Sequence, residues 1–314
     1  DFEEIGAPSS VKELIEATQG IPKKSLLVLD EVQALGGWEK FVRSEVEYER
    51  HKLLITGSSA TLLSKEIASS LAGRAVPRQV LPLSYRDARA WGVKKLADYE
   101  QIGGYPECVL RPQDANTLHK LYFELAILRD VAARKKIRET KPLADLALIL
   151  LSESGKRISS KKTCEKIGVS QPTFRSFVEG LQDAFLIASV HPFTRSPREK
   201  IVSDAKHYAF DTGLQKTISI SQSIDEGRRL ENVVAIELIR RGFEVSYLSA
   251  DKECDFIAQA PGKQPLAIQV SAAEELPQRE IEGLEAGMKH ANAKGLMLTK
   301  TPVEQVLPRN AFAK

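Results

Sequence analysis

Two uninterrupted aliphatic runs near the start of the chain constrain its fold more than any other feature. Residues 26–29 and 53–55 lack the alternation of apolar and polar side chains that marks a strand with one face in water. Such runs are typical of parallel strands that are buried on both faces. Between them, apolar residues recur at helical spacing from Trp38 to Val46. The pattern predicts a β-α-β unit with a right-handed crossover, preceded by a helix over residues 10–19.

Two acidic residues, Asp30 and Glu31, come directly after the first run. A buried parallel strand delivers its carboxyl end to the ligand crevice of an α/β sheet. There an aspartate can hold the magnesium shell and an adjacent glutamate can polarise the attacking water, as in the Walker B sequence of ATPases. Acidic residues also end strands simply because turns are polar, and the pair alone does not decide between these readings.

Composition excludes several classes of protein. The 314 residues are 42% hydrophobic and 28% charged, with a net charge of +3, which is too small to indicate nucleic-acid binding by itself. No apolar run reaches the roughly 18 residues of a membrane span, and the first residues do not read as a signal peptide. The three cysteines show no metal-ligand spacing with one another or with the five histidines. We expect two or three domains, a cytoplasmic location and no membrane partner.

A helical region occupies the middle of the chain. Apolar residues at helical spacing predict a helix over 118–131. Two shorter helices, over 159–167 and 170–183, form a helix-turn-helix candidate. Gly168 suits the end of the first of these helices, and Ser170 suits the N-cap of the second.

Basic residues surround this pair of short helices. A winged helix in a groove of duplex DNA would place its lysines on phosphates and turn its second helix toward the bases. The alternative is a helical domain that packs against protein and leaves a basic face in water. The predicted DNA-contacting residues are Lys161, Lys162, Gln171, Thr173 and Arg175, with Ser176, Lys156, Arg157 and Lys166 nearby and Arg195, Arg198 and Lys200 in a wing between 186–188 and 207–210.

The last third of the chain has the element order helix, three strands, helix, strand. The predicted ranges are 229–241, 244–248, 254–259, 266–271, 274–290 and 296–299. This order resembles the restriction-endonuclease-like fold, whose active members place Glu, Asp and Glu-x-Lys around a magnesium ion.

That resemblance assigns Glu231 and Asp255 to two acidic positions of the site, with Asp255 as the candidate metal ligand. Gln269 stands where the second acid of the motif is expected, and Ser271 stands where the lysine is expected. Gln269 removes a carboxylate ligand from the metal site, and Ser271 removes the cation that would stabilise charge on the phosphate. We therefore expect a folded nuclease-like domain that is catalytically weak or inactive. The residues that could assist or replace the lysine are Glu253, Lys252 and Lys300.

An ordered set of motifs resembles one family. The motifs are Val28-Leu29-Asp30-Glu31-Val32-Gln33, Trp38-Glu39, Leu54-Ile55-Thr56-Gly57-Ser58-Ser59, Leu71-Ala72-Gly73-Arg74, Leu81-Pro82-Leu83-Ser84-Tyr85, Gly103-Gly104-Tyr105-Pro106 and Phe210-Asp211-Thr212-Gly213-Leu214. Together they resemble the bacterial and archaeal AAA-type ATPases that carry an uncharacterised C-terminal domain. The resemblance covers nearly the whole chain and implies ATP and Mg²⁺ as cofactors.

The resemblance also implies roles for single residues. Asp30 and Glu31 correspond to the Walker B residues, and Asp30 would hold magnesium through the nucleotide. Thr56 or Ser58 corresponds to a sensor of the γ-phosphate or the attacking water. Arg74 corresponds to an arginine that contacts nucleotide or forms a salt bridge within the domain.

The family's phosphate-binding loop, G-x-x-x-x-G-K-[ST], does not occur in the 314 residues. In the family this loop should precede the strand that ends at Asp1, and it presents phosphates to a helix N-terminus. We expect that it belongs to a segment missing ahead of the first residue, the alternative being a degenerate homologue. ATP binding and hydrolysis depend on that segment.

The combined prediction is an α/β multidomain protein. It comprises a partial P-loop NTPase domain with a parallel sheet over 1–95, a helical and winged-helix domain over 96–205, and a restriction-endonuclease-like domain over 206–314. The leading function is an AAA-type ATPase associated with duplex DNA, in which nucleotide state repositions the other two domains. The alternatives are a metal-dependent nuclease regulated by the ATPase domain, and a non-enzymatic regulatory or assembly protein.

Overall fold

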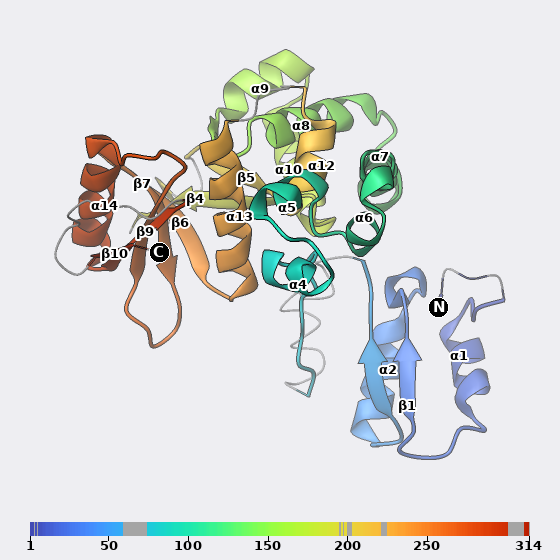
Figure 1. Cartoon of the computed structure of the whole chain (residues 1–314). Helices are drawn as coiled ribbons and strands as arrows, with labels where there is room; N and C mark the ends of the chain where they lie inside the picture. The colour runs from blue at the N-terminus through green and yellow to red at the C-terminus, as the bar shows by residue number, and fades with distance from the viewer. Residues whose placement is uncertain are drawn as a thin grey trace. The chain divides into compact units, whose positions relative to one another are not determined.

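The computed structural model describes residues 1–2, 4, 6–58, 74–194, 196, 198–199, 203–220, 225–300 and 311–313. The chain divides into two compact units, unit 1 over Asp1–Val80 and unit 2 over Leu81–Lys314 (Figure 1). Both contain helices and sheets, which confirms the α/β class. The three-domain division stays a prediction. In the described ranges no helix is both long and apolar enough to cross a membrane.

Unit 1 contains the predicted β-α-β unit. Its elements are α1 (Val11–Thr18), β1 (Leu26–Leu29), the 3-10 turn η1 (Val32–Ala34), α2 (Trp38–Glu47) and β2 (Lys52–Ile55). β1 and β2 pair in parallel, with Leu29 opposite Ile55. The Ser10 side chain caps α1 by accepting a hydrogen bond from the Glu13 N–H. The core of the unit is formed by Leu14, Leu27, Leu29, Val32, Leu35, Trp38, Phe41 and Val42.

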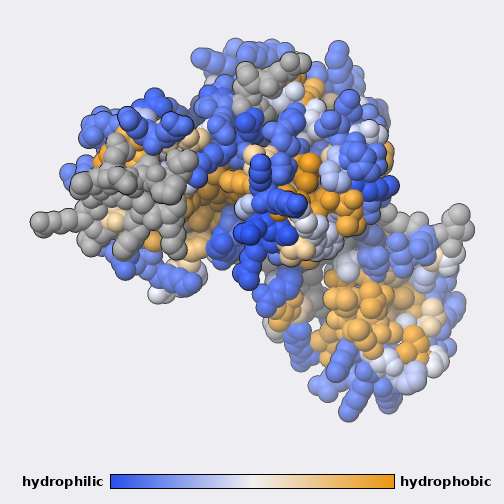
Figure 2. All heavy atoms as spheres, in the orientation of Figure 1, coloured by the Kyte–Doolittle hydropathy of each residue, from blue (hydrophilic) through white to orange (hydrophobic). Residues whose placement is uncertain are grey.

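One face of the β1–β2 pair is open. Leu27 and Leu29 are buried in the core with α1 and α2, whereas Leu26, Val28 and Leu54 are 60%, 55% and 51% exposed. Figure 2 shows an apolar surface over these strands. The prediction that the strand over 26–29 is buried on both faces is therefore wrong. Among the residues that the structure describes, helices cover only one side of this parallel pair, although parallel sheets are ordinarily covered on both.

The first part of unit 2 is helical. Its helices are α4 (Tyr85–Ala90), α5 (Leu96–Ile102), α6 (Pro106–Leu110), η3 (Pro112–Asp114), α7 (Ala115–Leu125), the π-helical η4 (Ala126–Ala133), α8 (Lys141–Ser152), α9 (Ser160–Ile167) and α10 (Gln171–Asp183). The two predicted short helices are confirmed as α9 and α10. Gly168 ends α9 at φ +70°, and the Ser170 hydroxyl accepts a hydrogen bond from the Thr173 N–H at the start of α10.

The strands of unit 2 join in one sheet within the described ranges. They are β3 (Arg157–Ile158), β4 (Ile187–Pro192), β5 (Ala205–Ala209), β6 (Glu244–Ser249), β7 (Glu253–Gln259), β8 (Leu266–Ser271), β9 (Lys294–Thr299) and β10 (Ala311–Ala313). Their spatial order is β10-β9-β8-β7-β6-β4-β5-β3. β4 pairs antiparallel with β5 and parallel with β6. The strands that accompany α9 and α10, namely β3, β4 and β5, therefore belong to the same sheet as the C-terminal strands.

Two further helices cover opposite faces of this sheet (Figure 1). α13 (Glu226–Arg240) packs on the face that carries Phe256 and Ile268. α14 (Gln278–Ala291) packs on the face that carries Ile257. Phe256 and Ile257 are neighbours in β7, as expected from the alternation of side chains along a strand. The predicted element order of the last third is confirmed, with α14 beginning at 278 instead of 274.

Two motifs that are 107 residues apart in sequence meet in unit 2. The Asp211 carboxylate accepts hydrogen bonds from the Gly104 N–H (2.6 Å) and the Leu214 N–H (2.8 Å), and it caps α12 (Thr212–Ile218). A Cβ atom at Gly103, which has φ +72°, would lie 2.0 Å from Asp211 Oδ1. Only glycine fits that position, and this contact joins α5 to α12.

Candidate functional site

The carboxyl ends of β1 and β2 bring the predicted ATPase residues together in unit 1. The Thr56 hydroxyl donates a hydrogen bond to the Asp30 carboxylate and accepts one from the Glu31 N–H (3.4 Å). The Thr56 N–H donates to the Leu29 carbonyl (2.9 Å), and the Val32 N–H donates to the Thr56 carbonyl (3.2 Å). Asp30 and Thr56 are therefore held side by side at the edge where a parallel sheet binds its ligands.

Glu31 is held by two polar residues. Its carboxylate accepts hydrogen bonds from the Ser58 hydroxyl (3.0 Å), the Ser58 N–H (3.3 Å) and the Gln33 amide. Glu31 has φ +53°, in the left-handed region that residues with a side chain rarely adopt. Such conformations persist where the surroundings hold them, and they are concentrated at functional sites. No role was predicted for Gln33 from the sequence, although its place two residues after Glu31 was the available signal.

This set of residues fits a magnesium ion that is bound with nucleotide. The Asp30 carboxylate supplies oxygen atoms of the kind that magnesium prefers, while the Thr56 and Ser58 hydroxyls donate hydrogen bonds to Asp30 and Glu31. Arg74 is exposed and forms no hydrogen bond or ion pair with another described residue. Its predicted nucleotide contact stays a prediction, because residues 59–73 of the adjoining motif lie outside the described ranges.

In unit 2, Lys206 on β5 meets Glu231 on α13. The Lys206 Nζ lies 3.3 Å from Glu231 Oε1, and the Tyr208 hydroxyl donates to the same oxygen (2.6 Å). The side chains of Lys206 and Glu231 are only 10% and 13% exposed. Burial alone would lower the pKa of Lys206, but the carboxylates of Glu231 and Asp255 outweigh it and raise this pKa. Lys206 is therefore a charged ammonium inside a nearly buried cluster.

Asp255 on β7 belongs to the same cluster. Its carboxylate accepts a hydrogen bond from the Val270 N–H (2.9 Å), and its N–H donates to the Gln269 side-chain carbonyl (3.2 Å). The Gln269 amide donates in turn to Glu280 on α14. Burial and, secondly, the Glu231 carboxylate raise the pKa of Asp255 well above its usual range. The structure thus brings Glu231, Asp255 and Gln269 together, while their catalytic role stays a prediction.

Lys206 was not predicted from the sequence, because this residue lies 25 positions before Glu231 and outside the Glu, Asp, Glu-x-Lys pattern. The lysines considered in its place are engaged elsewhere: Lys252 pairs with Glu282, and Lys300 pairs with Glu100 and Glu226. The Ser271 hydroxyl accepts a hydrogen bond from the Ala273 N–H (3.3 Å), and Glu253 pairs with Arg157. No group of three or more His, Cys, Asp or Glu side chains in the described ranges is placed to hold a metal ion.

The predicted DNA-contacting residues lie on α9 and α10. Lys161, Lys162 and Arg175 are exposed, and none of them forms an ion pair with a residue that the structure describes. Gln171 is partly exposed, and the Thr173 hydroxyl is hydrogen-bonded at the cap of α10. Of the other basic residues, Lys156 and Arg157 pair with Glu153 and Glu253, and Arg195 and Lys200 lie outside the described residues.

Comparison with known families agrees with the first of these sites. Residues 1–88 match the AAA domain family, which supports an AAA-type, ATPase-like protein. Residues 93–223 match a domain of unknown function (DUF8612), which includes α9, α10 and the Gly104–Asp211 contact. No solved structure is significantly similar to the chain.

Three curated proteins are similar over most of the chain. An uncharacterized protein of Haemophilus influenzae is 30% identical over 298 residues, which cover 90% of this chain and 72% of that protein. The uncharacterized protein MJ1544 of Methanocaldococcus jannaschii is 31% identical, with coverages of 90% and 69%. The uncharacterized protein MJ1637 of the same organism is 23% identical, with coverages of 84% and 64%. The chain, with its AAA domain, therefore belongs to the family of the first two of these uncharacterised proteins.

Proposed function

We propose that this chain acts in an ATP-binding and ATP-hydrolysing protein that associates with duplex DNA. The observation that carries the ATPase proposal is the arrangement of Asp30, Glu31 and Thr56 at the carboxyl ends of two parallel strands. The AAA domain match over residues 1–88 supports the same activity.

Each residue of this arrangement has a distinct task in the proposed reaction. A bound magnesium ion would neutralise negative charge on the nucleotide's phosphates. Asp30 would hold the ion, and the Thr56 hydroxyl fixes the orientation of the Asp30 carboxylate by donating a hydrogen bond to it. Glu31 polarises the attacking water. Ser58 and Gln33 set the position of the Glu31 carboxylate, since both donate hydrogen bonds to it.

The test uses the protein at the length of its relatives, because residues 1–314 contain no phosphate-binding loop sequence. The wild-type protein should bind and hydrolyse ATP. Glu31→Gln should keep ATP binding and lower turnover about 100-fold or more, the effect of losing a general base. The control is Glu47→Gln, an exposed acid on α2, which should leave turnover unchanged. Undiminished turnover in Glu31→Gln, or turnover by residues 1–314 alone, would contradict the proposal.

Association with DNA is supported by the topology around α9 and α10. The elements α8, β3, α9, α10, β4 and β5 follow one another along the chain, and β3, β5 and β4 lie side by side in that order. This order of elements would suit a winged helix, in which α10 would enter the major groove. Lys161 and Lys162 are exposed for contacts with phosphates, and Arg175 is exposed on α10.

The DNA proposal predicts a change in salt dependence. Lys161→Ala combined with Lys162→Ala should weaken duplex binding and reduce the slope of log K against log salt by roughly one to two units. Lys263→Ala combined with Lys289→Ala removes the same charge from exposed positions outside this surface and serves as the control. An unchanged affinity and slope in the first variant would remove α9 from the DNA contact.

A second candidate function is metal-dependent cleavage of a phosphodiester in unit 2, and Lys206 is the observation that favours it. Ser271 provides no positive charge at the lysine position of the motif. Lys206 instead places an ammonium beside Glu231, and this ammonium also interacts with the Asp255 carboxylate. Glu231 and Asp255 would hold a divalent cation, which supplies Lewis acidity. Lys206 would stabilise the negative charge that develops on the phosphate.

Cleavage of plasmid and oligonucleotide DNA with magnesium or manganese tests this second function. If it holds, the chain cuts DNA, and both Asp255→Asn and Lys206→Met lower the rate about 100-fold or more. Lys252→Met is the control, because Lys252 pairs with Glu282 on the protein surface. Unfolding midpoints show whether the variants remain folded. If the wild-type chain does not cleave DNA, this second function is wrong and the nuclease-like domain serves binding or packing. If the protein also fails to turn over ATP, a non-enzymatic regulator is favoured.

A further inference from the structure

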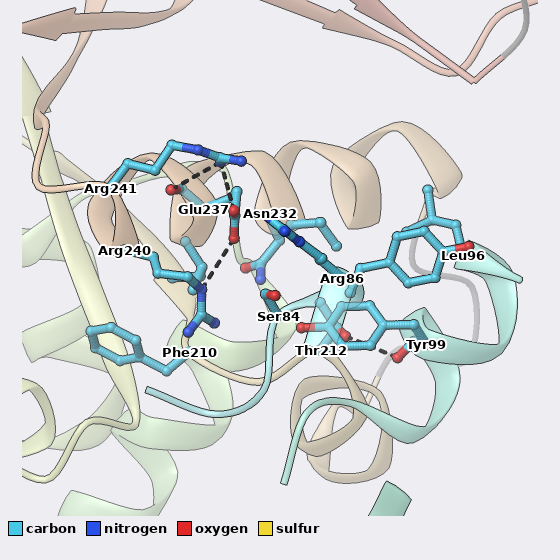
Figure 3. Close-up of a pocket in the computed structure, with 13 residues that line it drawn as sticks. Ser84, Arg86, Leu96, Tyr99, Phe210, Thr212, Asn232, Glu237, Arg240 and Arg241 are labelled. Carbon is cyan, nitrogen blue, oxygen red and sulfur yellow. Dashed lines mark hydrogen bonds and ion pairs between the residues drawn. The ribbon is translucent and has the colours of Figure 1, made fainter. Parts of the chain in front are cut away.

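Unit 2 contains a pocket of about 290 Å³ that includes none of the predicted ATPase, DNA-contacting or nuclease-like residues (Figure 3). It lies between the short helices α4 and α5 on one side and the long helix α13 on the other. Phe210, which precedes α12, and Thr212, the first residue of α12, also line it. A volume of this size accommodates a small organic molecule.

The charges that line the pocket are mostly positive. Its lining contains three arginines and one acid, Glu237. Arg240 is committed to the fold, because its guanidinium donates to the Pro82 carbonyl (2.6 Å) and to Glu237 (3.1 Å). Arg241 shares Glu237 (2.6 Å) and leaves 59% of its side chain exposed. Arg86 on α4 is exposed and makes no hydrogen bond or ion pair with any described residue. The lining of the pocket therefore holds three guanidinium groups and a single carboxylate.

The rest of the lining includes apolar side chains and two tyrosines whose hydroxyls already have hydrogen-bond partners. Leu96, Val233 and Ile236 present aliphatic surface, and the rings of Tyr85 and Tyr99 lie 5.7 Å apart between centroids. The Tyr99 hydroxyl donates to the Leu83 carbonyl (2.8 Å), and the Tyr85 hydroxyl donates to the Lys94 carbonyl (3.3 Å). The pocket therefore offers a ligand flat apolar walls together with guanidinium donors.

We propose that this pocket binds a small organic anion with a flat apolar body. The body lies between the tyrosine rings and the α13 side chains, and the phosphate or carboxylate head accepts hydrogen bonds from Arg86 and Arg241. Guanidinium groups suit such heads because their donors form paired hydrogen bonds to two oxygens. The pocket is thus a ligand site in addition to the nucleotide and DNA sites proposed above.

Phenyl phosphate is the probe, and its binding to the 314-residue chain is measured by isothermal titration calorimetry and saturation-transfer NMR. Inorganic phosphate carries the charge without the ring, and benzyl alcohol carries the ring without the charge. Phenyl phosphate should bind more tightly than either. Arg86→Gln and Arg241→Gln should each weaken its binding about tenfold, as expected for a lost charge-assisted hydrogen bond. Lys289→Gln, which removes a charge at an exposed position on α14, should leave binding unchanged.

Val233→Phe narrows the pocket and keeps all three arginines, so it should reduce binding of phenyl phosphate without adding or removing charge. Circular dichroism establishes that each variant is folded. The proposal is overturned if phenyl phosphate binds no better than inorganic phosphate, or if both arginine variants bind it as the wild type does.

Discussion

At the residue scale, the fully buried Asn232 joins helix α13 to strand β5. Its amide donates to the Ala209 carbonyl (2.8 Å), and its side-chain carbonyl accepts from the Ala209 N–H (2.8 Å) and the Ser154 hydroxyl (2.7 Å). The Asn232 side chain on α13 thus pairs with the backbone N–H and carbonyl of Ala209 in β5, much as a neighbouring strand would. Its neighbour Glu231 faces Lys206, so the same contact positions the charged cluster of unit 2.

Replacement of Asn232 by alanine should destabilise the protein by about 3 kcal/mol, because the buried N–H and carbonyl of Ala209 lose their partners and Ser154 keeps only the His207 carbonyl. Urea unfolding measures the change. Asn116→Ala is the control: Asn116 also accepts a hydrogen bond, from Thr217, but it is exposed, and its loss should cost less than about 1 kcal/mol. A small effect at both positions would show that the Asn232 contact contributes little.

The buried His207 makes stability depend on pH. Burial, and secondly the neighbouring His191, lower the pKa of His207 to about 4. An unfolded chain takes up this proton near pH 6.5, whereas the folded chain does so only near pH 4, so the stabilisation is complete above pH 6.5 and is lost as the pH falls. Between pH 7 and pH 5 this single group should remove about 2 kcal/mol of unfolding free energy.

Unfolding at the two pH values, compared between the wild type and His207→Gln, isolates that contribution. The variant should lose less stability than the wild type over this interval. His290→Gln, at an exposed position on α14, should behave as the wild type does. An equal loss in His207→Gln and the wild type would show that His207 is not the titrating group.

At the element scale, α12 packs against α5 and α7 through a glycine. A Cβ atom at Gly213 would lie 2.4 Å from the Ile102 carbonyl carbon and 2.6 Å from His119 Cε1. Neither atom can move away easily, because Ile102 contributes backbone and His119 is fully buried. The close approach of these helices therefore depends on the absence of a side chain at this position.

Gly213→Ala should destabilise the protein by about 3 kcal/mol through overpacking. Gly227→Ala is the matched control, since the nearest atom to an added Cβ there lies at 3.7 Å and the position is in the first turn of α13. That change should lie within about 1 kcal/mol of the wild type. Thermal unfolding of the two variants decides, and similar midpoints for both would contradict the packing argument.

At the scale of the whole molecule, each unit has hydrophobic cores of its own. The core of unit 1 uses residues up to Ile55, and the cores of unit 2 use residues from Leu81 onward. A unit with its own core can fold independently.

Residues 81–314 should therefore fold without residues 1–80. Expressed alone, they should show the circular dichroism of a mixed α/β protein and a cooperative urea transition of about 5–15 kcal/mol. The full chain should show an additional transition from unit 1. Loss of cooperative unfolding in residues 81–314 would mean that the two units fold as one.

Local sequence patterns were sufficient to predict most elements and their order. The strands over 26–29 and 266–271, the boundary between α9 and α10, and the parallel β1–β2 pair all follow from periodicity, caps and turn residues. These signals are local, because a repeat of apolar residues records which face of an element is buried and a cap satisfies backbone groups within a few residues.

Long-range packing was needed for the rest. A periodic pattern does not record which other element covers a face, and so the open side of β1 and β2 was not foreseen. The contact of Asp211 with Gly104 and the pairing of Lys206 with Glu231 join elements that are far apart in sequence. Each contact depends on strand register and on the docking of helices against the sheet. The pKa shift of Lys206 arises only when this packing has brought its ammonium next to the Glu231 carboxylate. The left-handed Glu31 likewise depends on Ser58, which reaches it only after β1 and β2 have paired.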